Sequence, residues 1–217
     1  MNDLLIKNPA HGIVLPIDVA KIKKRALSES EMLTVKSLDL DDRTRCFVYL
    51  LMYSGMRKSE ALAITKGDID IDNNLITVSK SLLFKVNQSE VKGTKTTSSI
   101  RTIPISEPLR PILYEYVKKI DTNFLFSSRD GGSISHTGYR RMWGKFEKAM
   151  NTKEITAHIF RHNFATILYN AGVDVKSAQY MLGHKSISVT LDIYTHLDKS
   201  KKDMAANKLN NFLTNLD

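Results

Sequence analysis

The pattern of apolar and polar positions in the first quarter of the chain predicts two helices. The run Cys46–Tyr53 is apolar at every position. Ser28 is followed three residues later by Glu31, the pattern of a capping box at a helix start. The acidic pair Asp41–Asp42 predicts the start of a second helix, which contains Cys46–Tyr53, and Gly55 predicts its end because glycine accepts the left-handed conformation.

Alternating positions then predict β-structure in the middle of the chain. Ile69 and Ile71 alternate with acidic residues, Asp72-Asn73-Asn74 supplies a turn, and Leu75–Val78 resumes β character. A second β stretch is expected around 82–86, followed by a polar loop, and 100–105 completes one small antiparallel sheet. Pro104 favours an edge position for the last strand, because proline has no amide proton to donate to a neighbour.

From residue 106 onward the pattern is helical. A final helix is expected from about Lys201, with an apolar stripe that reaches Leu216. The predicted fold class is therefore α+β, mostly α-helical with a small antiparallel sheet. Four further helices are expected to be capped by Ser106, Ser135, Thr156 and Asp174 and to end near Lys119, Met150, Asn170 and Gly183.

Charge indicates the class of partner. The 217 residues contain 32 Lys and Arg against 23 Asp and Glu, a formal net charge of +9. Such an excess favours a polyanion, with nucleic acid first and an anionic membrane second. At 42% apolar residues the chain can bury a core, which excludes a disordered protein.

Other classes are also excluded by composition. Cys46 is the single cysteine, so an intramolecular disulfide is impossible and a buried thiol is the simpler interpretation. The apolar runs are far shorter than the roughly 20 residues that a membrane helix needs. The N-terminus lacks the pattern of a signal peptide, so we expect a cytoplasmic protein.

Five residues that could together attack a phosphodiester are spread over more than half of the chain: Arg57, His158, Arg161, His184 and Tyr194. A guanidinium offers a planar fork of donors to phosphate oxygens. Histidine can transfer protons, and a tyrosine phenol can act as a nucleophile. No packing rule requires this set, so it points to chemistry on a phosphate ester.

These residues lie in motifs that resemble the tyrosine recombinase (phage integrase) family in order and approximate spacing: Gly55-Met-Arg-Lys-Ser-Glu60, His158-x-x-Arg161-His162, Leu182-Gly-His184 and Tyr194. The resemblance covers about 28–197, which is the expected catalytic domain. The composition of 1–27 predicts a linker or N-terminal arm, and 198–217 is expected to be a C-terminal helix or tail. The tail either docks in trans on a neighbouring protomer or packs on its own domain. Family members usually have a core-binding domain, for which 1–27 leaves no room, so a catalytic fragment or a short member is expected.

The resemblance also implies roles for the five residues. Arg57 and Arg161 would hold the non-bridging oxygens of the scissile phosphate. Tyr194 would attack phosphorus, displace the 5′ hydroxyl and leave a 3′-phosphotyrosyl link. A phenol with an ordinary pKa of about 10 needs a base or a strong positive field, and His158 is the candidate to accept its proton. His184 would donate to a phosphate oxygen, or cap the preceding helix, or both.

Further residues are assigned to the site, the lysine by the same resemblance and the others by their position in predicted helices. The leaving 5′ oxygen would take its proton from a lysine, for which Lys95 between two threonines is the better match and Lys92 the alternative. A short helix expected at 57–64 puts Arg57 and Glu60 on one face, so Glu60 would orient that arginine or a neighbouring helix and take no part in the chemistry. The helix expected at 135–150 offers basic side chains for contacts with DNA phosphates or grooves: Arg140, Arg141 and Lys145.

The implied chemistry requires no cofactor and no metal. His158 and His162 are spaced like a zinc pair, but Ile159 stands where the zinc-protease pattern has glutamate. The resemblance implies double-stranded DNA as partner, a homo-oligomer that is a tetramer on synapsed DNA, and a site-specific recombinase or integrase of a phage or mobile element. Two alternatives are a type IB topoisomerase-like enzyme that relaxes DNA and a DNA-binding regulator that no longer cuts.

Overall fold

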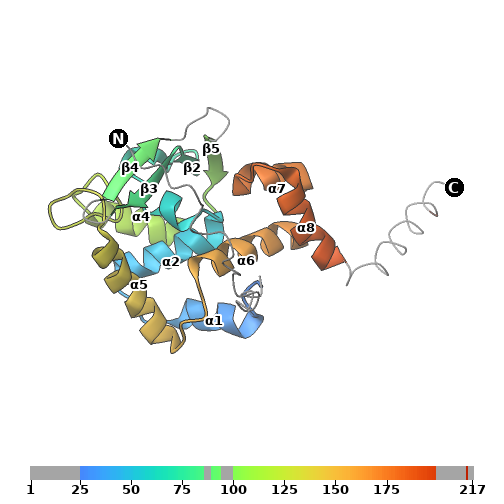
Figure 1. Cartoon of the computed structure of the whole chain (residues 1–217), viewed down its shortest axis with the longest axis horizontal. Helices are drawn as coiled ribbons and strands as arrows, with labels where there is room; N and C mark the ends of the chain where they lie inside the picture. The colour runs from blue at the N-terminus through green and yellow to red at the C-terminus, as the bar shows by residue number, and fades with distance from the viewer. Residues whose placement is uncertain (1–24, 86–88, 94–99, 199–213, 215–217) are drawn as a thin grey trace, which may run out of the picture.

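The computed structural model describes residues 25–85, 89–93, 100–198 and residue 214 (Figure 1). The helices are α1 Glu29–Ser37, α2 Asp42–Ser54, α3 Lys58–Ala61, α4 Arg110–Lys119, α5 His136–Met150, α6 Ala157–Asn170, α7 Val175–Leu182 and α8 Ile187–Asp198, with a 3₁₀ turn at Lys66–Asp68. The strands are β1 Ile69–Asp70, β2 Leu75–Val78, β3 Lys80–Phe84, β4 Ser89–Gly93 and β5 Arg101–Pro104. This mainly helical architecture with small antiparallel sheets confirms the predicted α+β class.

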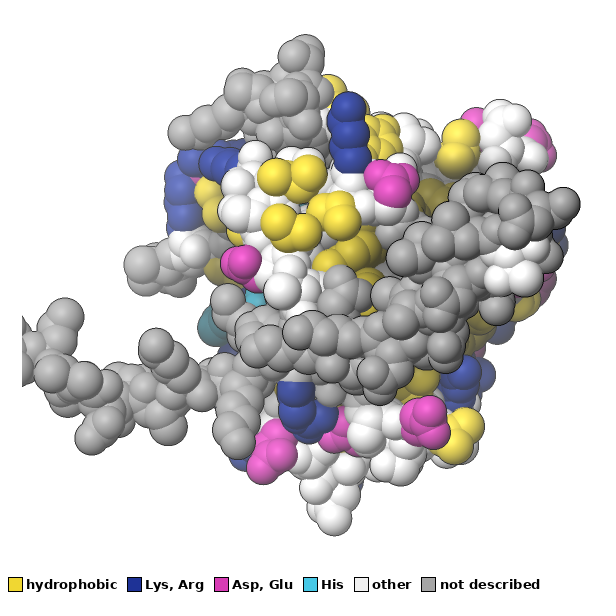
Figure 2. Space-filling model, turned by 90° about the vertical axis from the view of Figure 1, so that its right-hand side faces the viewer, with side chains coloured by type: hydrophobic (Ala, Val, Ile, Leu, Met, Phe, Trp, Pro, Cys, Tyr) yellow, Lys and Arg dark blue, Asp and Glu magenta, His cyan; other side chains and the backbone are white. Residues whose placement is uncertain are grey.

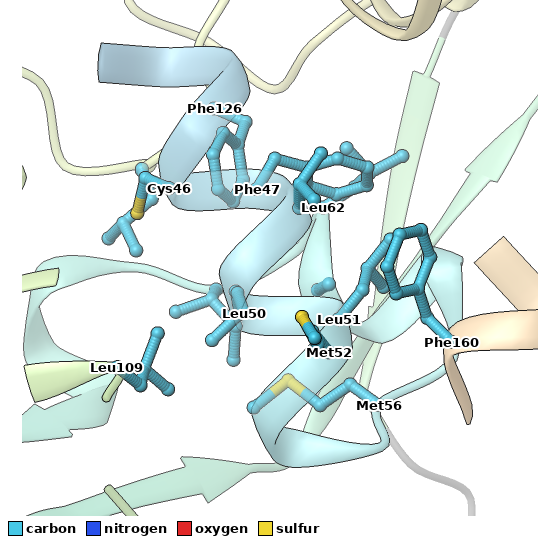
Figure 3. Packing of buried hydrophobic residues seen from close by; sticks show 14 of the residues in the cluster. Cys46, Phe47, Leu50, Leu51, Met52, Met56, Leu62, Leu109, Phe126 and Phe160 are labelled. Carbon is cyan, nitrogen blue, oxygen red and sulfur yellow. The ribbon is translucent and has the colours of Figure 1, made fainter. Parts of the chain in front are cut away.

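Helix α2 lies at the centre of the main core (Figure 3). Its start is fixed by Asp41, which accepts the Thr44 amide at 3.1 Å, and Gly55 ends it with a left-handed φ of 61°. Both ends were predicted. Phe47 is fully buried and meets Phe126 edge to face, with ring centroids 5.0 Å apart. Burial of such a side chain stabilises the fold by about 2–3 kcal/mol, so α2 is a rigid base for the segment that follows Gly55.

Most of the other predicted helix ends are confirmed. Ser28 and Ser135 accept amide bonds at the starts of α1 and α5, and Asp174 and Gly183 flank α7. Thr156 precedes α6 but makes no side-chain cap bond.

The predicted cap at Ser106 is wrong. Helix α4 begins at Arg110, and the Ser106 carbonyl accepts the amides of Leu109 and Arg110 in a preceding turn. Proline fits the first turn of a helix because the amide it lacks has no helical acceptor there. Pro111 therefore suits the observed start at Arg110.

The β-structure forms two sheets, where one was expected. Strands β1, β2 and β5 form an antiparallel sheet in that order, and β3 and β4 form a separate hairpin. Strand β4 replaces the predicted polar loop: it pairs residue by residue with β3, from Lys80 opposite Gly93 to Phe84 opposite Ser89. Pro104 lies on β5 at the edge of the three-stranded sheet, as predicted.

Helix α6 joins the main core to a second, smaller one. The second cluster consists of buried side chains from α6, α7 and α8: Phe164, Ala165, Leu168, Ala178, Leu182 and Tyr194. Helices α7 and α8 stand to one side of the body in Figure 1. Helix α8 was not predicted, and the helix expected at 201–216 lies outside the described residues apart from Thr214. None of the described helices is long and apolar enough to cross a membrane.

Candidate active site

Arg57 is held by two acceptors from distant parts of the chain. It donates from Nη1 to Glu60 Oε1 at 2.8 Å and from Nη2 to the Gly183 carbonyl at 2.8 Å. Its backbone amide also donates to Glu60 Oε2, at 2.8 Å. Glu60 thus contacts Arg57 as the sequence predicted. The Arg57 side chain remains 44% exposed, so it is fixed in direction but still accessible to a ligand.

Arg161 lies inside the molecule. It is 5% exposed on α6 and donates from Nη1 to the Gly55 carbonyl at 2.8 Å. Its Nη2 is buried and has no hydrogen-bond partner among the described residues. Burial, followed by the positive charge of Arg57, lowers the pKa of Arg161 to about 9. The guanidinium is therefore still charged at neutral pH, and an anion would satisfy both its unpaired donor and its charge.

An open pocket lies between α3, α5 and the start of α6. Its volume is about 470 Å³, and an aromatic wall from α5 faces the basic side chains. It brings Arg57 together with His158 and Arg161, which follow it by about a hundred positions in the sequence. The pocket is lined by Arg57, Lys58, Ser59, Tyr139, Trp143, Thr156, Ala157, His158 and Arg161.

His184 follows the turn that ends α7. Its Nδ1 is 2.8 Å from the buried Thr190 Oγ1 on α8. Burial, followed by the charges of Arg161 and Arg57, lowers the pKa of His184 to about 4. The ring is therefore neutral at pH 7. When Thr190 donates to Nδ1, the ring proton sits on Nε2, which can then donate to a phosphate oxygen.

We expect His184→Asn to reduce the acid sensitivity of the fold. The folded-state pKa of about 4 lies below the ordinary 6.5, so the unfolded chain binds more protons between those values. The stability that neutral His184 contributes is present above pH 6.5 and is lost as pH falls toward 4. Urea midpoints at pH 7 and pH 5 measure this loss, and an equal loss in both proteins would contradict it.

Tyr194 is not at the pocket. It is 6% exposed in the second cluster, where its hydroxyl donates to the Val173 carbonyl at 3.1 Å. Its ring meets Tyr169 edge to face, with centroids 5.0 Å apart. Burial, followed by the charge of Asp174, raises the pKa of Tyr194. The structure therefore separates the candidate nucleophile from the arginines, which the sequence did not predict.

The remaining predicted residues have different locations. Lys95 lies outside the described residues, and the alternative Lys92 is exposed on β4. Arg140 is exposed on α5. Arg141 and Lys145, on the same helix, line a second basic pocket of about 600 Å³, where Lys145 pairs with Asp41 at 3.0 Å. Within the described part of the chain, His, Cys, Asp and Glu form no group of three that could hold a metal ion.

A third arginine near the site was missed by the sequence analysis. Arg101 on β5 is 4% exposed and forms two bonds with the Glu60 carboxylate, at 2.7 and 3.2 Å. A signal was present in the sequence. Alternate residues of a strand point to the same face, so Arg101 lies on the buried face with Ile103, where an apolar residue is expected.

Residues 27–201 match the model of the phage integrase family. Among curated proteins, the tyrosine recombinase XerC of Bacillus subtilis (strain 168) is 31% identical over 211 residues, covering 90% of this chain and 64% of that protein. A XerC-like tyrosine recombinase of Caldanaerobacter subterraneus is 27% identical over 236 residues, covering 95% of this chain and 60% of that protein. The chain thus spans less than two thirds of the length of these relatives.

Solved structures show the same fold. The Tn1549 transposon integrase, in complex with circular intermediate DNA, superimposes with a TM-score of 0.72 at 28% identity, covering 84% of this chain and 67% of that one. XerA recombinase superimposes with a TM-score of 0.63 at 28% identity, covering 84% of this chain and 64% of that one.

Proposed function

The chain belongs to the phage integrase family, and we propose that it is the catalytic part of a site-specific DNA recombinase. It would cleave one DNA strand at a time through a 3′-phosphotyrosyl intermediate and rejoin it to a new partner. Its relatives are named tyrosine recombinases, and the Tn1549 integrase is described with DNA of a transposon intermediate. A phage or another mobile element is therefore the proposed origin, and the cytoplasm the place of action.

The single observation that supports this function best is the pair of arginines at the pocket. Arg57 is pre-oriented by two acceptors, and Arg161 keeps one buried donor unpaired. Both line the pocket together with His158. A phosphodiester carries one negative charge, and a second develops on its oxygens as a nucleophile adds. Donors fixed in advance stabilise the second charge most, which is how they lower the barrier.

The proposed reaction conserves the phosphodiester. The Tyr194 oxygen bonds to phosphorus, and the bond from phosphorus to the 5′ oxygen breaks. The phenol proton passes to His158, while His184 donates from Nε2 to a non-bridging oxygen. Lys95, which lies outside the described residues, would protonate the leaving oxygen. Rejoining reverses these steps with another 5′ hydroxyl, so no energy source and no cofactor are required.

Tyr194 must leave its present site before it can react. Its hydroxyl is bonded to the Val173 carbonyl, and its ring packs in the second cluster. We propose that DNA binding shifts α8 and releases this tyrosine. A nucleophile stored in this way would prevent cleavage by the DNA-free protein. The basic side chains of α5, Arg140, Arg141 and Lys145, are proposed to contact the DNA backbone.

Assembly on DNA is proposed to involve the C-terminal segment. Figure 2 shows the side of the molecule where α7 and α8 lie, with apolar side chains exposed there; those about half exposed are Tyr180, Ile187, Val189 and Leu191. Residues 198–217 would dock in trans on a neighbour in a tetramer on synapsed DNA. Light scattering of the chain lacking residues 200–217 on its DNA site should show a loss of complexes larger than two copies, whereas unchanged complexes would contradict trans docking.

A selection from pooled DNA tests the proposed function. The protein is incubated with nicked duplexes of randomised sequence, covalent complexes are isolated under denaturing conditions, and the attached DNA is sequenced. Recovery of one site, followed by strand exchange between two copies of that site, is the expected result. Relaxation of supercoiled plasmids irrespective of sequence would indicate a topoisomerase instead. Binding without covalent complexes would indicate a regulator that does not cut.

A further inference from the structure

Arg101 connects three elements around the candidate site. It extends from β5, which lies beside α7 in Figure 1. Its Nη1 and Nη2 donate to the two oxygens of Glu60, at 3.2 and 2.7 Å, and its Nε donates to the Met181 carbonyl at 2.9 Å. One buried side chain thus fixes both the carboxylate on α3 and the last turn of α7.

Arg101 bonds directly to one acceptor of the Arg57 guanidinium and to the turn that carries the other. The first is Glu60, whose Oε1 accepts from Arg57 and from Arg101. The second is the carbonyl of Gly183, two residues beyond the Met181 carbonyl that Arg101 binds. A displacement of Arg101 would therefore release the Arg57 guanidinium on both sides.

Gly183 brings the backbone against Arg101. A Cβ at this position would lie 2.8 Å from Arg101 Nη1, which is closer than a Cβ comes to a neighbouring atom in folded proteins. The φ of Gly183, 65°, is also left-handed. Glycine is therefore required here both for its conformation and for the space it leaves. His184 follows directly, so Arg101 also fixes the turn from which that ring extends.

Stability alone does not explain a charged side chain at this position. Well-packed apolar residues often replace buried ion pairs with no loss of stability. Here Arg57 and Arg101 share the carboxylate of Glu60, and the repulsion of Arg161 by both guanidiniums contributes to the lowered pKa of Arg161, after burial. An apolar pair at positions 60 and 101 would pack without burying either charge. The planar guanidinium of Arg101 instead bonds to a carboxylate and a carbonyl at the same time, and so fixes the orientation of both groups.

We propose that Arg101 is a positioning residue for strand cleavage: by fixing Glu60 and the turn at Gly183, it holds Arg57 in the direction that phosphate binding requires. The proposal rests on the proposed function, because it assigns a role within the same site. Arg101 touches no reacting atom and acts through Arg57. Misplacement of a reacting group by about 1 Å can cost about 10²-fold in rate, which sets the scale of the expected effect.

The test compares two substitutions of Arg101 with a matched control. Arg101→Met keeps an unbranched stem and removes the guanidinium donors, and Arg101→Lys keeps the positive charge without the planar fork of donors. At saturating nicked DNA we expect Arg101→Met to lower the first-order cleavage rate about 10²-fold, Arg101→Lys to lower it less, and both to leave the Kd for DNA within about threefold. The control is Arg25→Met, which breaks another arginine–glutamate pair held by two hydrogen bonds, to Glu31 at 2.6 and 2.7 Å. Its cleavage rate at saturating DNA should equal that of the wild type.

A double-mutant cycle distinguishes positioning from folding. If Arg101 acts through Glu60, then Arg101→Met should cost far less in a Glu60→Gln background than in the wild type. In Arg101→Met alone, the buried Glu60 carboxylate loses its partner, which can prevent folding. The double variant Arg101→Met, Glu60→Gln has a neutral amide in place of that carboxylate, so we expect it to fold. Additive losses of rate in the cycle would overturn the proposal.

The pKa of Glu60, measured by NMR titration, tests the contact between Arg101 and Glu60 without any DNA cleavage. Arg57 on the preceding loop and Arg101 on β5 are bonded to Glu60, and the charge of Glu60 also acts on Arg161 of α6. His184 beyond α7 is influenced by the same three arginines. The pKa of Glu60 lies below its ordinary value: burial raises it, but the bonds and charge of Arg101, followed by those of Arg57, lower it by more. The pKa should rise in Arg101→Met and in Arg101→Lys, and stay unchanged in Arg25→Met.

The outcomes separate the two claims. A wild-type protein that cleaves no DNA would contradict the proposed function, while a rise in the Glu60 pKa would still support the link from Arg101. A wild type that cleaves, with Arg101→Met at an unchanged saturated rate, would overturn the positioning role alone. An unchanged Glu60 pKa in Arg101→Met would overturn it as well.

Discussion

Arg161→Met is expected to lower the rate of strand cleavage by about 10²- to 10³-fold, the usual loss when one fixed donor to a developing oxyanion is removed. Arg161 is buried on α6 and keeps Nη2 unpaired among the described residues. Because its position is set before DNA binds, no energy is needed to orient it during the reaction. Methionine matches the unbranched stem of arginine and removes every donor. Single-turnover cleavage of nicked duplex DNA measures the effect.

The same substitution should not lower the stability of the DNA-free protein. Burial and the neighbouring arginines lower the pKa of Arg161 to about 9, so its charged form is less favourable in the fold than in the unfolded chain. Methionine removes that cost and loses one bond to the Gly55 carbonyl. Arg110→Met, at an exposed residue of α4, is the control for activity. Cleavage by Arg161→Met within threefold of wild type, or a large fall in its urea midpoint, would contradict this account.

Tyr194→Phe is expected to eliminate covalent attachment to DNA, with a fall in cleavage of about 10⁴-fold or more, as for the loss of a nucleophile in other enzymes. The phenol oxygen is the only atom removed. The ring and its packing against Tyr169 remain, so DNA affinity should be unchanged. Cleavage is measured by the shift of labelled DNA on a denaturing gel.

The stability of Tyr194→Phe should change little. The lost bond to the Val173 carbonyl contributes about 1 kcal/mol in a typical protein. Tyr53→Phe, on α2, is the control for loss of a phenol elsewhere. Persistent covalent complexes in Tyr194→Phe would place the nucleophile on another residue and contradict the assignment.

The parts of the fold that the sequence predicted depend on local chemistry. Asp41 and Gly55 delimit α2, and Asp174 and Gly183 delimit α7, because a cap bond and a left-handed glycine involve only a few neighbouring residues. Ser106 was misassigned because a serine near a helix start is a cap only when the helix begins at the next residue.

The parts that were missed depend on distant contacts. Strand β4 has a single apolar residue, Val91, and is held by its pairing with β3. Helix α8 is rich in β-branched residues, which form helices poorly, and is held instead by its packing on α6 and α7. Contacts between residues that are distant in sequence cannot be predicted from the pattern of neighbouring residues.

The candidate site divides in the same way. Arg57, His158 and Arg161 were selected from motifs, and all three line one pocket. The bond from Arg57 to the Gly183 carbonyl and the burial of Tyr194 could not be predicted, because both depend on how α7 and α8 pack against the rest of the chain. Arg101 left a signal, a charge in the apolar phase of a strand, which becomes meaningful once Glu60 is seen beside it.

The most direct test of the central claim is to identify the residue that carries the DNA. The wild-type protein is trapped on a nicked duplex of its own site, digested with protease and nuclease, and analysed by mass spectrometry. We predict a nucleotide linked through its 3′ phosphate to the peptide that contains Tyr194, with fragment ions that place it on that residue. An adduct on any other residue, or its survival in Tyr194→Phe, would contradict the account.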